Sequence, residues 1–203
     1  MDRLIAGYRA FRAGRWPQER ARYAELAQQG QSPDYLVISC SDSRADPATI
    51  FSAAPGELFV VRNVAGIVPP FEPDAGYHGT SAAIAFAVIR LGVKHALVLG
   101  HAQCGGIAAA IDGNLTDGVP FLGNWIALLA PALARSATLA SAADRHTALE
   151  RDAVRLSLGN LKTFPFVAER LAQGRLALHG ARFGIADGRL EMLDASGNFS
   201  AVE

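Results

Sequence analysis

Hydrophobic and polar positions divide the chain into an amino-terminal helical segment and a longer part in which strands and helices alternate. In residues 2–30, apolar side chains recur every three or four positions, which predicts helices on either side of Pro17. Residues 35–39 and 58–62 are short apolar runs, as expected of strands that are buried on both faces. Residues 80–91 are apolar over too great a length for a strand and predict a buried helix.

The alternation of strands and helices continues toward the carboxyl terminus. Residues 94–99 predict a third strand, and residues 105–111 predict a short helix directly after it. Helices dominate the pattern after residue 120, and residues 176–185 and 190–193 predict a terminal hairpin. This order indicates an α/β fold with a mostly parallel central sheet of four to five strands, flanked by helices.

The length of 203 residues is that of one domain with its own hydrophobic core. We expect residues 1–30 to form an N-terminal helical arm and residues 31–203 to form the α/β core of this single domain. Six arginines stand in the arm. They fit either a solvated helix face or an arm that packs on a partner subunit, and the pattern alone leaves both open.

Composition and charge exclude several classes of protein. Half of the residues are apolar, which is typical of a globular chain and not of a disordered one. The 19 basic and 19 acidic side chains cancel, whereas a dedicated nucleic-acid binder normally carries a basic excess. The amino terminus lacks the apolar stretch of a secretory signal, and no apolar run is long enough to span a membrane. We therefore expect a soluble, cytoplasmic protein that binds neither nucleic acid nor membrane.

The chain has only two cysteines, Cys40 and Cys104. A reducing compartment disfavours a disulfide between them, and the lack of a C-x-x-C motif disfavours a redox pair. Both follow a predicted strand, at the edge where open α/β sheets bind ligands. With His101 they would supply two thiolates and one imidazole if the strands were adjacent, a set suited to tetrahedral zinc. Two core thiols beside an ordinary turn histidine are the other interpretation.

The residues after Cys40 favour the metal site. Three protein ligands leave the fourth position of a tetrahedral zinc ion open, as in catalytic sites. Asp42 could fill that position or accept a hydrogen bond from a zinc-bound water, and Arg44 could pair with Asp42 and keep it ionised. An ordinary salt bridge in an exposed loop is the alternative for these two residues.

The segments CSDSR, PGELFVVRNVAGIVPP, GTSAAIAFAV and GHAQCGGI, in this order and spacing, resemble the β-class carbonic anhydrases. A weaker similarity follows in RLSLGNLKTFPFV, nearer the carboxyl terminus. The resemblance implies one zinc ion per subunit, bound by Cys40, His101 and Cys104. It also implies a parallel sheet that is extended at one edge.

The same resemblance implies an activity and an assembly. Asp42 and Arg44 would form a catalytic dyad in the reversible hydration of carbon dioxide to bicarbonate and a proton, carried out by zinc-bound hydroxide. The subunits would form a homodimer or a dimer of dimers, in which the N-terminal helices clasp the neighbouring subunit. This favours the second interpretation of the arm, as a segment that packs on a partner.

Further matches point to the substrate pocket of the plant-type subclass. Gln31 matches a glutamine that hydrogen-bonds substrate, and Phe59 and Val64 match apolar pocket positions. Phe86 stands where that subclass commonly has tyrosine, so a hydroxyl group is missing there. Independently of the resemblance, Gly105 opens a predicted helix whose N–H groups could stabilise the oxygens of the forming bicarbonate.

Three other functions fit parts of the pattern. One is a zinc hydrolase on the same fold that acts on a related small heteroallene, such as carbon disulfide. Another is a zinc-stabilised binding protein in which Asp42 closes the fourth metal position permanently. A nucleotide-binding α/β domain ranks last, because no G-x-G-x-x-G or P-loop motif follows the early strands.

Overall fold

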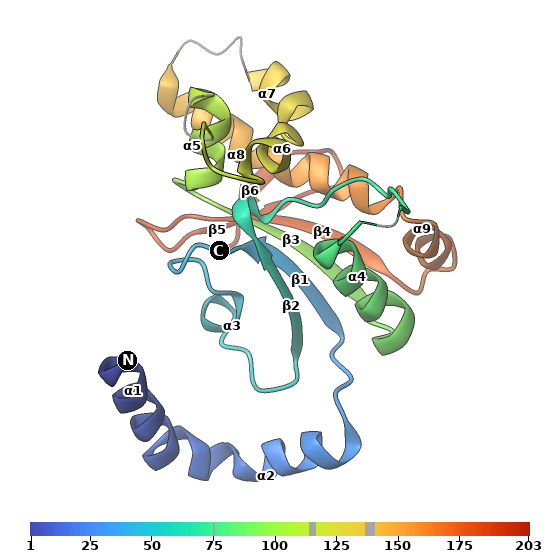
Figure 1. Cartoon of the computed structure of the whole chain (residues 1–203). Helices are drawn as coiled ribbons and strands as arrows, with labels where there is room; N and C mark the ends of the chain where they lie inside the picture. Colours follow the sequence, from blue (N-terminus) through green and yellow to red (C-terminus); the bar gives the residue numbers. More distant parts are fainter. Residues whose placement is uncertain (75, 114–116, 137–140) are drawn as a thin grey trace.

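A mixed sheet of six strands forms the centre of the molecule (Figure 1). The computed structural model describes residues 1–74, 76–113, 117–136 and 141–203. The strands lie in the order β2-β1-β3-β4-β5-β6. They are β1 (Tyr35–Cys40), β2 (Leu58–Asn63), β3 (His95–His101), β4 (Ala177–Phe183), β5 (Leu190–Leu193) and β6 (Phe199–Ala201).

The first four strands in this order are parallel, and the last two run antiparallel to their neighbours. The predicted α/β architecture is therefore confirmed, including the β4–β5 hairpin at the carboxyl terminus. The sheet has one strand more than the four to five expected. The additional strand, β6, has only three residues, too few for a hydrophobic period to reveal it.

Helices pack mainly on one side of the sheet, and two more form the N-terminal arm. The helices are α1 (Asp2–Ala13), α2 (Arg15–Gln29), α3 (Pro47–Ile50), α4 (Gly79–Ala85), α5 (Gly105–Asp112), α6 (Leu122–Ala127), α7 (Ala130–Ser136), α8 (Ala142–Leu161) and α9 (Pro165–Ala172). Two short helical turns complete them, a 3-10 turn at Val64–Gly66 and a π-helical turn at Phe86–Leu91 that continues α4. Among the described residues, none of the helices combines the length and the apolar character needed to cross a membrane.

The two faces of the sheet differ in how they are covered. On one face, Leu36, Ile38 and Val98 pack with buried side chains of α4, α8 and α9 in the main hydrophobic core. On the opposite face, Val37 and Leu99 belong to a smaller cluster, to which only α3 contributes among the described helices. Much of that second face is therefore left without a helical layer.

The N-terminal arm lies apart from the rest of the chain (Figure 1). Neither α1 nor α2 contains a buried residue, and Leu4 and Tyr8 are 69% and 61% exposed. The described contacts of α2 with the core include Arg22 Nε, which donates to the Pro55 carbonyl at 3.2 Å, and Leu26, whose side chain lies against Gly56. The arm is therefore helical as predicted, but its apolar side chains are not buried within this chain.

Candidate metal centre and its surroundings

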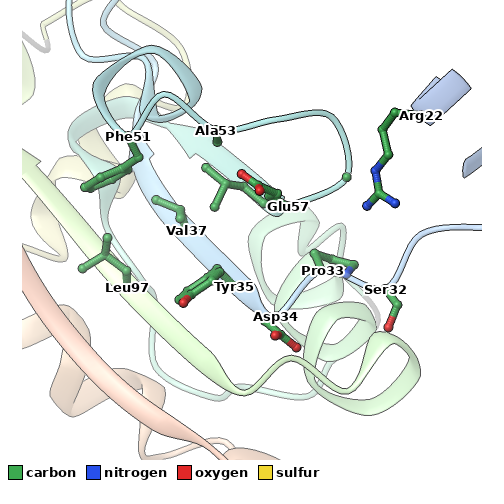
Figure 2. A pocket seen from close by; sticks show the side chains of 12 residues that line it. Arg22, Ser32, Pro33, Asp34, Tyr35, Val37, Phe51, Ala53, Glu57 and Leu97 are labelled. Atoms are coloured by element: carbon green, nitrogen blue, oxygen red, sulfur yellow. The ribbon is translucent and has the colours of Figure 1, made fainter. Parts of the chain in front are cut away.

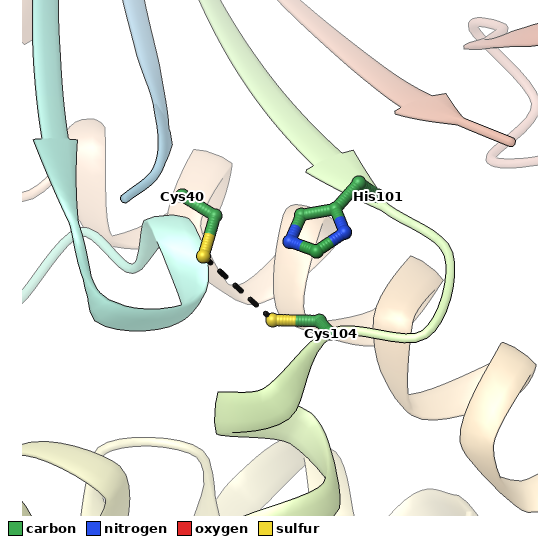
Figure 3. A group of neighbouring side chains, drawn as sticks. All are labelled: Cys40, His101 and Cys104. Carbon is green, nitrogen blue, oxygen red and sulfur yellow. Dashed lines mark hydrogen bonds between the residues drawn. The ribbon is translucent and has the colours of Figure 1, made fainter. Parts of the chain in front are cut away.

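Two adjacent parallel strands bring Cys40, His101 and Cys104 together (Figure 3). Cys40 ends β1, His101 ends β3, and Cys104 is the N-cap residue of α5. Their ligand atoms all lie within 4.8 Å of one another, and the two Sγ atoms are 3.9 Å apart. All three side chains are buried, so they form a preorganised cluster and not a chance gathering on the surface.

The His101 ring is oriented by its own turn. Nδ1 donates to the Ala102 carbonyl at 2.9 Å, which fixes the tautomer with a free electron pair on Nε2. Nε2 is buried and has no hydrogen-bond partner in the described part of the chain. An unpartnered buried nitrogen beside two thiols fits a metal ligand, and two sulfurs with one imidazole are the donors that zinc prefers.

The two thiols are joined by a hydrogen bond between their Sγ atoms. This bond lowers the pKa of Cys40, although burial opposes its ionisation. The same hydrogen bond raises the pKa of Cys104, and burial raises it further. Cys40 is thus the thiol that ionises more readily. Since thiolates are the species that bind metals, the cluster is prepared for a cation.

Close packing closes the cluster on its inner side. A Cβ atom at Gly66 would lie 3.0 Å from the Cys40 nitrogen, and Gly66 also has a φ of +62°. A Cβ atom at Gly106 would lie 2.7 Å from the Ala65 Cβ. Both approaches require glycine, because any side chain would push the 3-10 turn or α5 away from the cluster.

Asp42 and Arg44 form a bidentate ion pair beside the cluster. Arg44 Nε and Nη2 donate to the two Asp42 carboxylate oxygens at 3.0 and 2.8 Å, and the Arg44 backbone N–H donates at 2.9 Å. Hydrogen bonding to Arg44 holds the pKa of Asp42 well below its usual range. Asp42 Oδ2 lies 3.9 Å from His101 Nε2. An ionised carboxylate therefore stands at the mouth of the cluster, held by its guanidinium partner.

Two further residues, neither of them predicted from the sequence, hold this region. Arg62 donates from Nε to the Cys40 carbonyl at 2.9 Å and from Nη2 to the Asp42 carbonyl at 2.6 Å. Glu150, on α8, accepts a hydrogen bond from the backbone of the turn between His101 and Cys104. Glu150 could have been found, because it interrupts an apolar helical stripe with a charge. Nothing in the pattern distinguishes Arg62 from other arginines.

The residues predicted to line the substrate pocket fall into two groups. Val64 directly follows Asn63, the β2 residue paired with Cys40, and Gly105 directly follows Cys104. Phe59, in contrast, pairs with Leu36, four residues or about 13 Å along the strands from the cluster.

The remaining two predicted pocket residues lie toward that distant end. The ring of Phe86 stacks on Phe59 with centroids 5.8 Å apart and is 46% exposed. Gln31 is exposed in the segment that precedes β1. Within one chain, Gln31, Phe59 and Phe86 therefore do not line the same pocket as Val64 and Gly105.

The structure has one cavity near Val64 and another near the amino ends of the strands. One, of about 830 Å³, opens beside Val64 and is walled by Trp125 and Leu128. The other, of about 460 Å³, lies between α2 and the amino ends of β1 and β3 (Figure 2). Figure 2 shows Tyr35, Val37 and Leu97 on its floor, which belongs to the face of the sheet with little helical cover.

Comparison with known proteins gives one consistent result. The family profile described as carbonic anhydrase matches residues 35–190. A carbonic anhydrase of Pseudomonas aeruginosa is 39% identical over 198 residues, which are 97% of this chain and 89% of that protein. The structure of the β-carbonic anhydrase CcaA superposes with a TM-score of 0.92 at 31% identity, covering 100% of this chain and 92% of that one. A tetrameric β-carbonic anhydrase of Sordaria macrospora gives 0.82 at 31% identity, with 98% of both chains covered.

Proposed function

Because this chain belongs to the β-class carbonic anhydrases, we propose that it catalyses the reversible hydration of carbon dioxide to bicarbonate and a proton at the Cys40–His101–Cys104 cluster. The observation that carries this proposal is the cluster itself, three buried ligands with an ionised Asp42 beside them. Three ligands leave one tetrahedral position for a reactant, which distinguishes a catalytic site from a closed structural one.

Cys40 Sγ, Cys104 Sγ and His101 Nε2 would hold one zinc ion per chain. When bound, zinc supplies Lewis acidity, which in carbonic anhydrases with three histidine ligands lowers the pKa of a coordinated water to about 7. Backbone donors support the thiolates, since the Asp42 N–H lies 3.4 Å from Cys40 Sγ and the start of α5 donates to Cys104. These contacts would reduce the negative charge on the sulfurs.

Asp42 would act on the proton of the attacking water. Oδ2 stands nearest to His101 Nε2, so it would accept a hydrogen bond from a water in the reaction space and direct the oxygen lone pair at carbon dioxide. Arg44 occupies both carboxylate oxygens, which keeps Asp42 ionised and fixes its plane. A dyad of this kind orients the nucleophile without having to carry the proton to solvent.

The start of α5 would receive the charge that develops on the substrate. Gly105 is its first residue, and the N–H groups of the first helical turn have no partner within the helix. These dipoles would stabilise the oxygens of forming bicarbonate, as helix N-termini do for other small anions. Val64, at the same edge of the sheet, would supply an apolar wall for carbon dioxide.

A second copy of the chain would complete this pocket. Gln31, Phe59 and Phe86 match pocket positions of the family, yet they lie away from the cluster of their own chain. If two copies meet with the end of the sheet that carries Phe59 against the partner's cluster, each lends these residues to the other. The tetrameric relative from Sordaria macrospora supports self-association, and a dimer is the smallest assembly that satisfies both sites.

The arm supports the same assembly. Leu4, Ile5 and Tyr8 of α1 are exposed, and the face of the sheet beneath the cavity in Figure 2 has little helical cover. An arm that lies on the partner would bury both surfaces at once. Burial of a large apolar side chain contributes about 2 kcal/mol, so each such contact would add to the stability of the dimer.

The test of the function is a paired measurement of metal and turnover. The purified protein should contain one zinc per chain and should accelerate carbon dioxide hydration in a stopped-flow assay. Removal of zinc by a chelator should abolish the activity, and added zinc should restore it. A fully zinc-loaded protein that does not accelerate hydration above the buffer rate at any pH between 6 and 9 would exclude the proposal.

A further inference from the structure

Glu150 is a buried carboxylate directly behind the turn that carries His101 and Cys104. Its side chain is 1% exposed and accepts three hydrogen bonds from three different elements. Oε1 accepts from the Gln103 backbone N–H at 2.6 Å and from His146 Nδ1 at 2.8 Å, while Oε2 accepts from Arg182 Nε at 2.7 Å. This carboxylate therefore ties α8 and β4 to the turn that bears two of the three proposed ligands.

The backbone that Glu150 holds is in an unfavourable conformation. Gln103 has a φ of +55°, in the left-handed region that residues other than glycine, asparagine and aspartate rarely adopt. Its side chain is exposed and makes no hydrogen bond among the described contacts, so it does not stabilise this conformation. In the same conformation, the Gln103 carbonyl accepts a hydrogen bond from Arg44 Nη2 at 3.2 Å.

We propose that Glu150 is a positioning residue for the metal centre. Glu150 accepts a hydrogen bond from the Gln103 N–H and so stabilises the left-handed conformation of Gln103. This conformation places Cys104 Sγ in the cluster and the Gln103 carbonyl against Arg44. The consequence for turnover rests on the proposed function, whereas the consequence for metal retention does not.

A second layer of charges holds Glu150 in place. Arg182 Nη1 lies 3.4 Å from Glu191 Oε2, and Glu191 pairs with Arg151 at 2.7 Å. Arg182 therefore stands between two carboxylates, which compensates the buried charge of Glu150. A buried ion pair with several donors is rigid, and rigidity is what a positioning role requires.

Glu150→Gln tests the proposal with little change in volume. Every donor around Glu150 points a hydrogen at an oxygen, so the amide NH2 of glutamine must face another donor in either orientation. We expect zinc to dissociate about tenfold faster into excess chelator, and kcat/KM for hydration to fall by a similar factor. In the zinc-stripped protein, hydrogen exchange at residues 101–105 should accelerate.

A rescue separates positioning of the turn from a general structural role. Glycine adopts a positive φ without help, so adding Gln103→Gly to Glu150→Gln should recover most of the lost zinc retention. The matched control is Asp152→Asn, which removes a carboxylate from the same helix that bonds Arg155 and does not contact the turn. We expect its zinc dissociation rate to equal that of the wild type.

A third variant leaves the Glu150 network intact and remains informative if Glu150→Gln does not fold. Gln103→Val replaces an exposed side chain, but a β-branched residue resists a positive φ, so zinc should again dissociate about tenfold faster. An unchanged zinc dissociation rate in Gln103→Val overturns the proposal. So does a Glu150→Gln defect that Gln103→Gly leaves uncorrected. These rates are measured without carbon dioxide, so an inactive wild-type protein would refute the proposed function and not this inference.

Discussion

The two ends of the β1–β2 pair differ in how much of the site they complete. At the carboxyl end, Cys40 meets His101 and Cys104 within one chain, with buried donors and a fixed tautomer. Toward the amino end, Phe59 and Phe86 stack on each other, and Phe86 remains 46% exposed. The three candidate ligands are thus brought together by one chain's topology, whereas under our proposal Phe59 and Phe86 would serve the site of a second copy.

The arm shows the same contrast with the core. Around the cluster, Arg62, Asp42 and Glu150 each make two or more specific hydrogen bonds. In α1 and α2 no residue is buried. Many specific hydrogen bonds hold the region around the cluster in a fixed geometry, whereas exposed apolar side chains such as those of α1 are typical of an interaction surface.

The largest effect should come from the Cys40–His101–Cys104 cluster, at the carboxyl end of the β1–β2 pair. Cys104→Ala removes one of two thiol ligands, and the chain has no other cysteine to replace it. We expect zinc content near zero and no measurable hydration, by metal analysis and stopped-flow assay. Ser136→Ala, which deletes a small buried group from α7, is the control and should keep both. Full zinc occupancy in Cys104→Ala would contradict the ligand set.

The next largest effect should come from Asp42, beside the cluster, where a substitution separates metal binding from catalysis. Asp42→Asn keeps the shape of the side chain but loses the charge that accepts a proton, so turnover should fall roughly 100-fold or more while zinc content stays at one per chain. Asp144→Asn, at the exposed start of α8, should behave as wild type. Wild-type turnover in Asp42→Asn would remove that carboxylate from the mechanism.

A smaller effect is expected from the N-terminal arm, residues 1–30. Deleting residues 1–30 should raise the dissociation constant of the dimer at least about 100-fold, because several large apolar contacts of about 2 kcal/mol each are lost. Sedimentation velocity over a concentration series measures this. Arg20→Ala leaves the apolar stripe intact and should not change the profile. A truncated chain that sediments as the full-length protein does would show that the arm is not part of the interface.

The smallest effect concerns the charges behind the cluster. Hydrogen bonding to Arg151, with the nearby Arg182, holds the pKa of Glu191 below its usual range. Ionised Glu191 therefore stabilises the folded state fully above about pH 4.3, the usual pKa of a glutamate in the unfolded chain. This contribution is lost as the pH falls through the lower pKa that Glu191 has in the folded state. Glu191→Gln should lower the free energy of unfolding by roughly 1 kcal/mol at pH 7. The difference in urea midpoint from wild type should shrink toward pH 3, and a difference that is constant with pH would contradict the assignment.

Local pattern predicted most of the fold. It offered Cys40, His101 and Cys104 as candidate metal ligands beside an interpretation as core residues, and the family resemblance favoured the ligands. Apolar runs located β1, β2 and β3, and the position of Cys40 and His101 at strand ends located the cluster, because parallel strands end at one edge. The Phe86–Leu91 turn is π-helical, which an apolar run does not distinguish from an α-helix.

What the sequence could not predict depends on contacts between distant segments. The hydrogen bond from Gln103 to Glu150 joins residues 47 positions apart, and it is made by a residue whose φ is left-handed. The resemblance placed Phe59 and Val64 in one pocket, but it does not state which chain supplies each residue. That question concerns an interface, and a single chain's hydrophobic pattern does not record where its neighbour lies.

The most direct test of whether the Phe59–Phe86 end of one chain serves the metal cluster of another is to mix two inactive variants. One chain carries Cys104→Ala and keeps the pocket residues, and the other carries Phe59→Arg with Phe86→Arg and keeps the metal ligands. If the pocket is supplied by the partner, each mixed dimer has one intact site, so subunit exchange should restore about one quarter of wild-type hydration activity. No activity from the mixture, with mixed dimers demonstrated by native mass spectrometry, would show that each chain builds its pocket alone.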